Sequence, residues 1–310
     1  MAKTELFVRQ QNGGIYTVVN ESLTTGNIFF VDSGSSTGGT SAGCGNSPDA
    51  PFTTIDSAIN QCTASQGDII YVMAGHSETL TGASAITCDV AGVSIIGLGR
   101  GTDRPTLLLD AGASVTIVVS AANVHFENII FSAGHADITV AIDVSAASAT
   151  FHRCEWKENT AAENFLTCIR TSAVANACDG LSVTNSVSTD VDTACINFVT
   201  VREDIDLFVM NDNFLELGVN DSNAVIGVAS GKDVTSVRIL NNDIFRLNTA
   251  GDLLIDSDTT ANSGIIANNR IGHADTSGEV LIDADGVRQF NNTGSATNTA
   301  SGYVLPAIDS

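Results

Sequence analysis

Paired aspartates are the residues of this sequence whose type and spacing best suit catalysis or metal binding. Four D-x-D pairs occur, and they are Asp190 and Asp192, Asp204 and Asp206, Asp256 and Asp258, and Asp283 and Asp285. Because side chains alternate along a strand, both carboxylates of a pair would lie on one face. Two carboxylates flanking a sugar bond are what glycoside hydrolysis requires, and clustered carboxylate oxygens also suit Ca²⁺. The pairs therefore raise two hypotheses, acid–base hydrolysis and a cation site.

The place of these acids in the chain favours a structural role instead. The residue four positions before each of eight recurring strands forms the series Asp89, Ser120, Ser145, Ala177, Glu203, Asp233, Thr260 and Asp283. Such positions suit turns, because Asp and Ser side chains bond to the turn backbone. We therefore expect no catalytic residue and no cofactor. A surface Ca²⁺ site remains the alternative, and its candidate ligands are Asp256, Asp258, Asp283 and Asp285.

Histidines and arginines are weaker candidates for a functional site. A Gly-His dipeptide occurs three times, at His76, His135 and His273. Histidine beside a carboxylate is a possible general base, but the three dipeptides fall at different places in the repeat, with no nucleophile or metal-ligand spacing nearby. Arg100 and Arg104 flank a turn that contains Asp103. We expect loop histidines without a role and a solvated ion pair at that turn.

A repeat organises the elements that carry these residues. The sequence contains eight copies of a short strand followed by a corner residue, spaced by about 28 residues. The corner residues are Gly97, Asn128, Arg153, Asn185, Asn211, Asn241, Asn268 and Asn291. This period is too short for a domain and suits one coil of a solenoid with three short strands. Asparagine tolerates a left-handed backbone and forms hydrogen-bonded ladders when stacked. We therefore predict Asn128, Asn185, Asn211, Asn241, Asn268 and Asn291 as structural corner residues.

The rest of the chain divides around this repeat. Residues 1–30 contain two alternating runs around a Gly-containing turn, which predict a small hairpin for anchoring or oligomerisation, with a third strand at Ile28–Val31. A short one-sided helix over residues 54–62, capped by Thr53 or Thr54, is expected to close the N-terminal end of the solenoid. The solenoid covers residues 31–293 in eight or nine coils. Residues 294–310 are predicted to form an extended tail that docks on a partner.

Charge and cysteine content limit the possible partners. The formal net charge is −22 at pH 7, and the 13 Lys and Arg residues are scattered singly. Binding to nucleic acid or an anionic membrane requires clustered cations, so we expect neither partner. The seven cysteines include no C-x-x-C motif, which suggests reduced, buried thiols and folding in a cytosol. The first residues lack an apolar segment, so we also expect no secretory signal.

Three segments carry a resemblance to a known superfamily. They are SPDAPFTTIDSAINQC at residues 47–62, GDIIYVMAGHSET at residues 67–79 and VAGVSIIGLGRGTDRPT at residues 90–106. The first two resemble the capping helix and first coil of the right-handed parallel β-helix superfamily, which includes pectate lyases and phage tailspikes. Together the three are similar to uncharacterised tailed-phage proteins thought to be virion components. The resemblance covers most of residues 28–293 and implies an all-β, right-handed, single-stranded parallel β-helix.

The enzymes of that superfamily carry residues that this chain lacks. There is no D-D, G-H-G or R-x-K block of the polygalacturonase type, and lysine is nearly absent from the repeats. The resemblance therefore implies a non-enzymatic virion structural protein, such as a capsid decoration or a fibre-like protein of the head or tail. Its expected place is the virion surface after assembly in the host cytoplasm, as a homotrimer in contact with capsid or tail proteins. The alternative is a tailspike-like protein that binds or cleaves a host-surface polysaccharide, and a bacterial adhesin is a weaker option.

Overall fold

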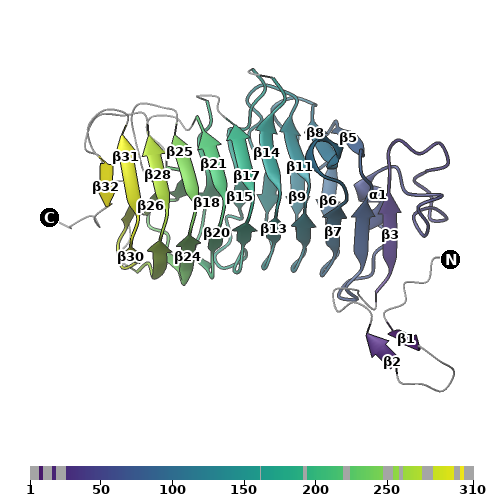
Figure 1. The fold of residues 1–310 in the computed structure, drawn as a ribbon, viewed down its shortest axis with the longest axis horizontal. Helices are drawn as coiled ribbons and strands as arrows, with labels where there is room; N and C mark the ends of the chain where they lie inside the picture. Colours follow the sequence, from purple (N-terminus) through teal and green to yellow (C-terminus); the bar gives the residue numbers. More distant parts are fainter. Residues whose placement is uncertain are drawn as a thin grey trace.

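The protein is an all-β parallel solenoid of about seven turns with almost no helix. The computed structural model describes residues 7–9, 16–18, 26–160, 162–190, 194–218, 224–246, 254–257, 261–273, 282–296 and 301–303. Figure 1 shows a rod in which the coils follow one another from the N-terminal end to the C-terminal end. Each coil contributes short strands to three long sheets, because the apolar positions of one coil are buried only when the next coil stacks on it.

The three sheets run along the rod and are called sheets I, II and III here. Sheet I contains β3 (Ile28–Val31), β4 (Ile69–Val72), β7 (Ser94–Gly97), β10 (His125–Glu127), β13 (Thr150–His152), β16 (Ser182–Thr184), β20 (Val209–Asn211), β24 (Val237–Leu240), β27 (Gly264–Ala267) and β30 (Arg288–Phe290). Sheet II contains β5 (Ser77–Leu80), β8 (Thr106–Leu109), β11 (Ile130–Ala133), β14 (Glu155–Glu158), β17 (Val187–Asp190), β21 (Phe214–Leu217), β25 (Asp243–Arg246), β28 (Arg270–His273), β31 (Thr293–Ala296) and β32 (Ser301–Tyr303). Sheet III contains β6 (Ile86–Cys88), β9 (Ile117–Val119), β12 (Ile142–Val144), β15 (Thr167–Thr171), β18 (Asn197–Val201), β22 (Ile226–Val228), β26 (Ile255–Ser257) and β29 (Asp283–Ala284).

The predicted fold class is confirmed, and the number of turns is close to the prediction. The eight strands of sheet III are separated by seven turns of the chain, whereas eight or nine coils were expected. The difference lies at the ends, where sheets I and II continue with strands that have no partner coil in sheet III. A minor pair, β19 (Ile205–Asp206) and β23 (Val234–Thr235), adds a short parallel ladder at one corner.

The N-terminal end of the rod is closed by the predicted helix. Helix α1 (Ile55–Ile59) is shorter than the predicted 54–62. It is capped by Thr54, whose hydroxyl accepts a hydrogen bond from the Ser57 N–H, and it buries its apolar face against β3, β4 and β6. The hairpin of β1 (Phe7–Arg9) and β2 (Tyr16–Val18) also forms as expected. The strand at Ile28–Val31, however, is not part of that hairpin. It pairs in parallel with β4, because its alternate apolar residues are buried in the first rung of sheet I.

The C-terminal segment is more regular than the predicted extended tail. Residues 293–296 form strand β31, which is parallel to β28, and β32 returns antiparallel to β31. The first part of the expected tail is therefore the last rung of sheet II. Residues 297–300 and 304–310, the rest of the segment for which docking on a partner was predicted, lie outside the described residues.

A continuous stack of rings fills the middle of the rod. Phe126 and Phe151 lie in register on neighbouring strands, with ring centroids 5.4 Å apart and nearly parallel planes. Trp156 lies 5.3 Å from Phe131 and 5.2 Å from Phe198, and all five rings are fully buried. Burial on the order of 25 cal/mol per Å² of apolar surface makes such large rings major contributors to stability.

The corners between sheets I and II are built as predicted in five of the six asparagine positions. Asn128, Asn185, Asn241, Asn268 and Asn291 all have φ between +51° and +58°. The sixth position is a correction: Asn211 is the last residue of β20, and the left-handed residue of that corner is Asp212 with φ of +58°. The four residues from Leu207 to Met210 are all apolar, so alternation does not fix which of them point inward. The sheet register places Met210 beside Ile239, which shifts the corner by one residue.

The asparagine ladder lies one residue beyond the left-handed corner residues. Its members are Ser186, Asn213, Asn242, Asn269 and Asn292, all buried. Asn242, Asn269 and Asn292 each accept, through Oδ1, hydrogen bonds from the backbone N–H and the Nδ2 of the preceding asparagine, at 2.9–3.1 Å. Asn213 Oδ1 accepts one from the Ser186 N–H at 2.9 Å. The Nδ2 of each ladder asparagine also donates to a backbone carbonyl of the preceding coil, as in the 2.8 Å bond from Asn242 to Met210. Asn242 thus uses both acceptor sites and both donors of its amide.

Candidate functional site

In the second D-x-D pair, Asp204 and Asp206 hold successive coils together, whereas Asp192 and the side chain of Asp190 lie outside the described residues. Asp204 Oδ1 accepts a hydrogen bond from the Asp233 N–H at 3.0 Å, and Asp206 Oδ1 accepts one from the Thr235 hydroxyl at 2.8 Å. The Asp206 N–H in turn donates to Asp179 Oδ1. These carboxylates are engaged in corner contacts of the kind that the turn position in the repeat suggested.

The calcium candidates are only partly covered by the structure. Asp283 begins β29, directly opposite Asp256 on β26. Asp258 and the side chain of Asp256 lie outside the described residues, and Asp285 follows β29 in the same corner. Within the described ranges, no group of three or more His, Cys, Asp or Glu residues is arranged to hold a metal ion. The surface Ca²⁺ site therefore stays a prediction.

The Gly-His dipeptides have no common role. His76 is buried, and its Nδ1 accepts a hydrogen bond from the Ser33 N–H at 2.9 Å, so its Nε2 carries the proton that faces Glu78 at 3.3 Å. Glu78 also accepts a hydrogen bond from the N–H of Ile55, the first residue of helix α1. This chain of contacts fixes the N-terminal cap. His135 is exposed in a loop, and the side chain of His273 is not among those described.

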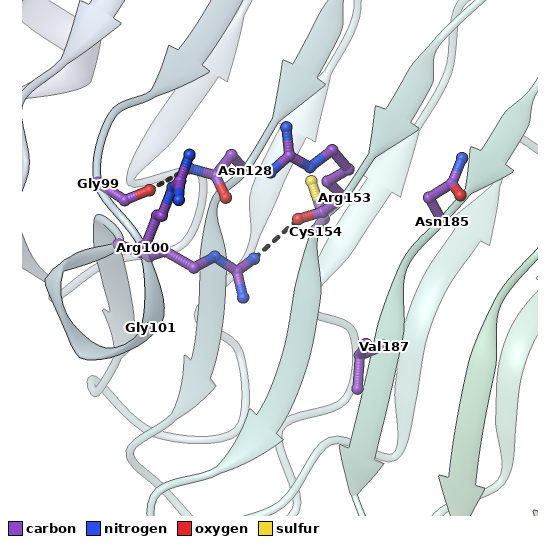
Figure 2. Close-up of a pocket in the computed structure, with 9 residues that line it drawn as sticks. Gly99, Arg100, Gly101, Asn128, Arg153, Cys154, Asn185 and Val187 are labelled. Carbon is purple, nitrogen blue, oxygen red and sulfur yellow. Dashed lines mark hydrogen bonds between the residues drawn. The ribbon is translucent and has the colours of Figure 1, made fainter.

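The most concentrated set of functional groups surrounds a pocket at a corner between sheets I and II (Figure 2). We call it the corner pocket. Its volume is about 250 Å³, and it is lined by Gly99, Arg100, Gly101, Arg104, Asn128, Arg153, Cys154, Asn185 and Val187. Three of the chain's few arginines therefore meet at one place on a strongly acidic protein. The loop before β8, with the short 3₁₀ turn Gly101–Asp103, carries two of them.

Arg104 does not form the ion pair that the sequence suggested. Its Nη1 donates to Glu155 Oε2 at 2.6 Å, and its Nη2 donates to the backbone carbonyl of Arg153 at 2.8 Å. Glu155 lies 51 residues further along the chain, and coil stacking brings it beside Arg104. The Nε of Arg104 is buried without a hydrogen-bond partner. The expected pair with Asp103 is thus replaced by contacts that cross two coils.

The other two arginines are less constrained. Arg100 is exposed at the mouth of the pocket. Arg153 occupies a left-handed corner and approaches Glu127 with an Nη1–Oε1 distance of 3.6 Å. Asn128 forms part of the floor, where its Nδ2 donates to the carbonyls of Gly97 and Gly99. A Cβ on Gly97 would lie 2.4 Å from the Asn128 carbonyl oxygen, so this close approach requires glycine.

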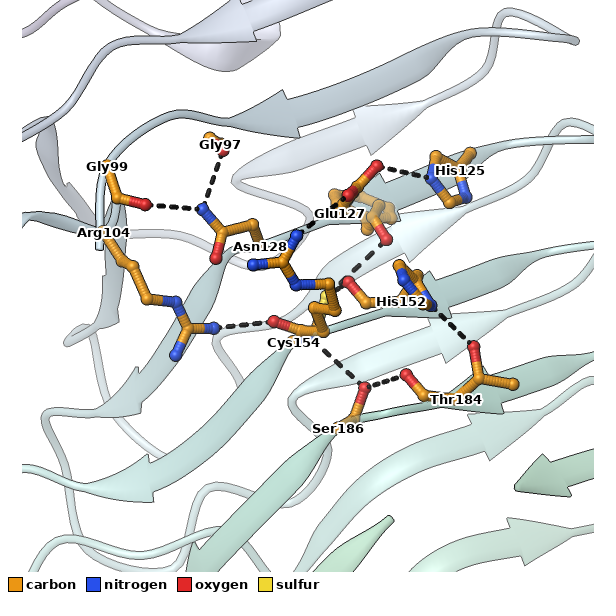
Figure 3. A network of polar contacts seen from close by, with 12 residues as sticks. Gly97, Gly99, Arg104, His125, Glu127, Asn128, His152, Cys154, Thr184 and Ser186 are labelled. Carbon is orange, nitrogen blue, oxygen red and sulfur yellow. Dashed lines mark hydrogen bonds and ion pairs between the residues drawn. The ribbon is translucent and has the colours of Figure 1, made fainter. Parts of the chain in front are cut away.

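A strip of histidines borders the pocket on the outer face of sheet I (Figure 3). His125 Nδ1 lies 2.6 Å from the Thr150 hydroxyl, and its Nε2 lies 3.6 Å from Glu127. Burial lowers the pKa of His125, against the opposing effect of the Glu127 carboxylate. A hydroxyl, an imidazole and a carboxylate in this order are the groups of nucleophilic catalysis.

The same pairing recurs one coil later, which favours a structural explanation. His152 Nδ1 lies 2.9 Å from the Thr184 hydroxyl, and both His–Thr pairs are direct cross-strand neighbours. Such pairs are the usual side-chain contacts of a solvent-facing sheet surface. The corner pocket and the adjoining strip therefore suit ligand binding through fixed charges and donors better than they suit bond cleavage.

Most of this site was missed in the sequence. Arg153 was placed only as a corner residue, and His125 and His152 were not singled out, because nothing local to them marks a site. The available signal was indirect: Arg153 replaces asparagine in the corner series, where a long cationic side chain is unusual. Its meaning depends on Arg100 and Arg104, which stacking places beside it.

The fold and these features define the chain as a parallel β-solenoid with a basic corner pocket. Comparisons with models of protein families, with curated proteins and with solved structures gave no match. In the part of the chain that the structure describes, no helix has the length and apolar character needed to cross a membrane.

Proposed function

We propose that the protein is a non-enzymatic structural component of a tailed-phage particle, displayed on the surface of the head or tail as a rigid rod. The observation that carries this proposal is the continuous axial packing of the solenoid, with rings in the middle coils and a satisfied amide ladder in the later ones. A rod built in this way presents a long surface, and its backbone has little conformational freedom. The biological setting comes only from the sequence resemblance described above, since the comparisons with known proteins gave no match.

The proposal includes a trimer and contacts with capsid or tail proteins. The hairpin of β1 and β2 at the N-terminal end is the proposed anchoring element (Figure 1). The motivation is that, among the described strands, only this hairpin pairs outside the stacked coils. The other strands belong to sheets I, II and III or to the β19–β23 ladder between two coils. The trimer is inferred from the resemblance to tailspikes. It predicts that the protein in solution has a mass three times that of one chain.

Electron microscopy of particles labelled with antibody against the solenoid tests this function. Label at fixed positions on the head or tail, and co-purification of the chain with capsid or tail proteins, are the expected results. Recovery of the chain only in the fraction without particles, as a monomer by light scattering, would contradict the proposal. A chain lacking residues 1–25 is the matched variant: it keeps the rod and is expected to lose attachment.

The corner pocket favours a second candidate function, the binding of a bacterial surface polysaccharide. Arginine side chains and amides around a small pocket are a suitable arrangement for a polar ligand. If this candidate is right, the protein retains host polysaccharide on a column. Release of shortened polysaccharide after incubation would additionally require cleavage, which the non-enzymatic proposal does not predict.

A further inference from the structure

We propose that the corner pocket binds the carboxylate of an acidic saccharide, with Arg100 as the main cation. This inference does not depend on a place in a phage particle, and it deepens the polysaccharide-binding candidate by naming the ligand chemistry. It rests on the charge balance of the pocket, on its size and on the surface beside it.

The charge of the pocket suits a monoanion. Arg104 is paired with Glu155, and Arg153 is near Glu127, so the three arginines and two glutamates leave one net positive charge. Arg100 supplies it, since no ion pair or hydrogen bond of its guanidinium is found among the described residues. A planar guanidinium binds a carboxylate through two parallel hydrogen bonds. A phosphate dianion would be balanced only in part.

The interior of the pocket offers further donors. Arg104 lines the pocket, and its Nε is buried without a hydrogen-bond partner, which leaves an unsatisfied donor beside the pocket. Asn185 lies on the opposite rim and is exposed (Figure 2). The volume of about 250 Å³ is below the roughly 300–1,000 Å³ of pockets for drug-sized ligands, so it suits one sugar ring.

An apolar surface continues from the pocket along sheet II. Val187 lines the pocket and lies directly opposite Phe214 on the next strand. Phe214 and Phe245 are each 41% exposed, with ring centroids 5.7 Å apart. The two ring planes are tilted by 48°, and both rings lie on the outer face of sheet II. Exposed apolar patches rimmed by polar groups mark ligand grooves, and the C–H faces of sugar rings pack on such surfaces.

A saccharide fits this surface better than a peptide does. The strands beneath it are paired on both sides, so their backbone groups are already engaged. An extended peptide that binds a sheet by strand addition needs a free edge. Saccharide hydroxyls need only side-chain and corner donors, which the pocket supplies. A second cavity beside Arg170 lacks a free cation, because Arg170 is paired with Asp143 at 2.6 Å.

Isothermal titration calorimetry of the full chain tests the proposal with three probes: a glucuronate-containing hyaluronan tetrasaccharide, neutral chitotetraose, and a capped tripeptide with a central glutamate. The expected result is binding of the hyaluronan tetrasaccharide alone, weakened at least about tenfold by Arg100→Gln. Arg238→Gln, which changes an exposed arginine on a later coil of sheet I, is the matched control and should leave binding unchanged.

Each other outcome overturns the proposal in a distinguishable way. If chitotetraose binds equally well and Arg100→Gln does not weaken this binding, the protein binds glycans, but the proposed carboxylate site is wrong. Stronger binding of the glutamate peptide would identify a protein partner. Absence of binding by all three probes at millimolar concentration would remove the site altogether, while leaving the particle-labelling experiment unaffected.

Discussion

The coils from β10 to β15 and the coils after β20 have the same three-sheet cross-section, but different side chains connect them. Phe126, Phe151 and Trp156 stack as rings in the first region, where volume and apolar burial dominate. In the second region, Asn213, Asn242 and Asn269 are joined by directional hydrogen bonds. Apolar packing tolerates small shifts, whereas an amide ladder is satisfied in one register only.

This difference indicates where ring packing is sufficient and where the amide ladder is needed. In the middle coils, large rings leave little choice about which residues point inward. In the later coils, the stretch from Leu207 to Met210 is apolar at every position, and Leu207 is 54% exposed. Such a strand fits two registers almost equally well. The ladder that begins between Ser186 and Asn213 supplies the missing information, because a one-residue slip would bury several amides without partners.

The largest expected effect comes from removing the ring at the centre of the middle coils. Trp156→Ala leaves a cavity among Phe131, Phe151 and Phe198, and we expect a loss of about 4 kcal/mol in the free energy of unfolding. Trp156→Phe is the control. It keeps most of the volume and removes an indole N–H that is buried without a partner, so its cost should stay below about 1.5 kcal/mol. Urea unfolding followed by circular dichroism measures both, and equal losses would show that packing is not the cause.

The next effect concerns the ladder. Asn242→Ala leaves the N–H and Nδ2 of Asn213 and the carbonyl of Met210 buried without their partner. We expect a loss of about 3 kcal/mol by the same urea measurement, since each orphaned group costs about 1–3 kcal/mol and the site relaxes in part. A loss under about 1 kcal/mol would mean that the ladder adds little and that the two regions are held by the same apolar contacts.

A much smaller effect is expected one residue earlier. Asn241 is exposed, has φ of +58°, and donates to Asp212 at 3.1 Å. Asn241→Gly keeps the left-handed backbone without strain, so the free energy of unfolding should change by less than about 0.5 kcal/mol. This variant is matched to Asn242→Ala in position and type. A large loss would place the stabilising amide at the predicted corner and not at its inner neighbour.

The smallest effect is a dependence on pH at the contact between Asp206 and Thr235. Hydrogen bonds from Thr235, and then from Ser236, hold the pKa of Asp206 below its usual value of 3.8. A lowered pKa in the folded state contributes stability above the ordinary carboxyl pKa, and this stability disappears as pH falls through the lowered value. Thr235→Val should therefore lower the urea midpoint slightly at pH 7 and leave it unchanged near pH 2. Thr116→Val, whose hydroxyl bonds a carbonyl in an early coil, should show no such pH dependence.

The solenoid could be predicted because its causes are local and periodic. Alternating apolar residues and polar corners recur at intervals of about 28 residues, and Thr54 and five of the six asparagine corners lie where they were expected. The ladder was placed one residue early, since the sequence shows pairs of asparagines without showing which member points inward.

The corner pocket had no such local signal. Arg104 meets Glu155 across 51 residues only after two coils have stacked. Spacing within the sequence suggested Asp103 as the partner, and the turn at Gly101–Asp103 directs the side chain elsewhere. Contacts between coils depend on the length of every intervening loop, and these lengths vary from one repeat to the next.

A double-mutant cycle on Asn242 and Asn269 tests the central claim of a continuous, register-setting ladder most directly. The single variants Asn242→Ala and Asn269→Ala and their combination are unfolded in urea, and the coupling is the departure of the double variant from the sum of the singles. Because Asn242 Nδ2 donates to Asn269 Oδ1 at 2.9 Å, we predict a coupling of about 1 kcal/mol or more. Additivity within about 0.3 kcal/mol would show that the two amides act independently, and it would contradict the ladder.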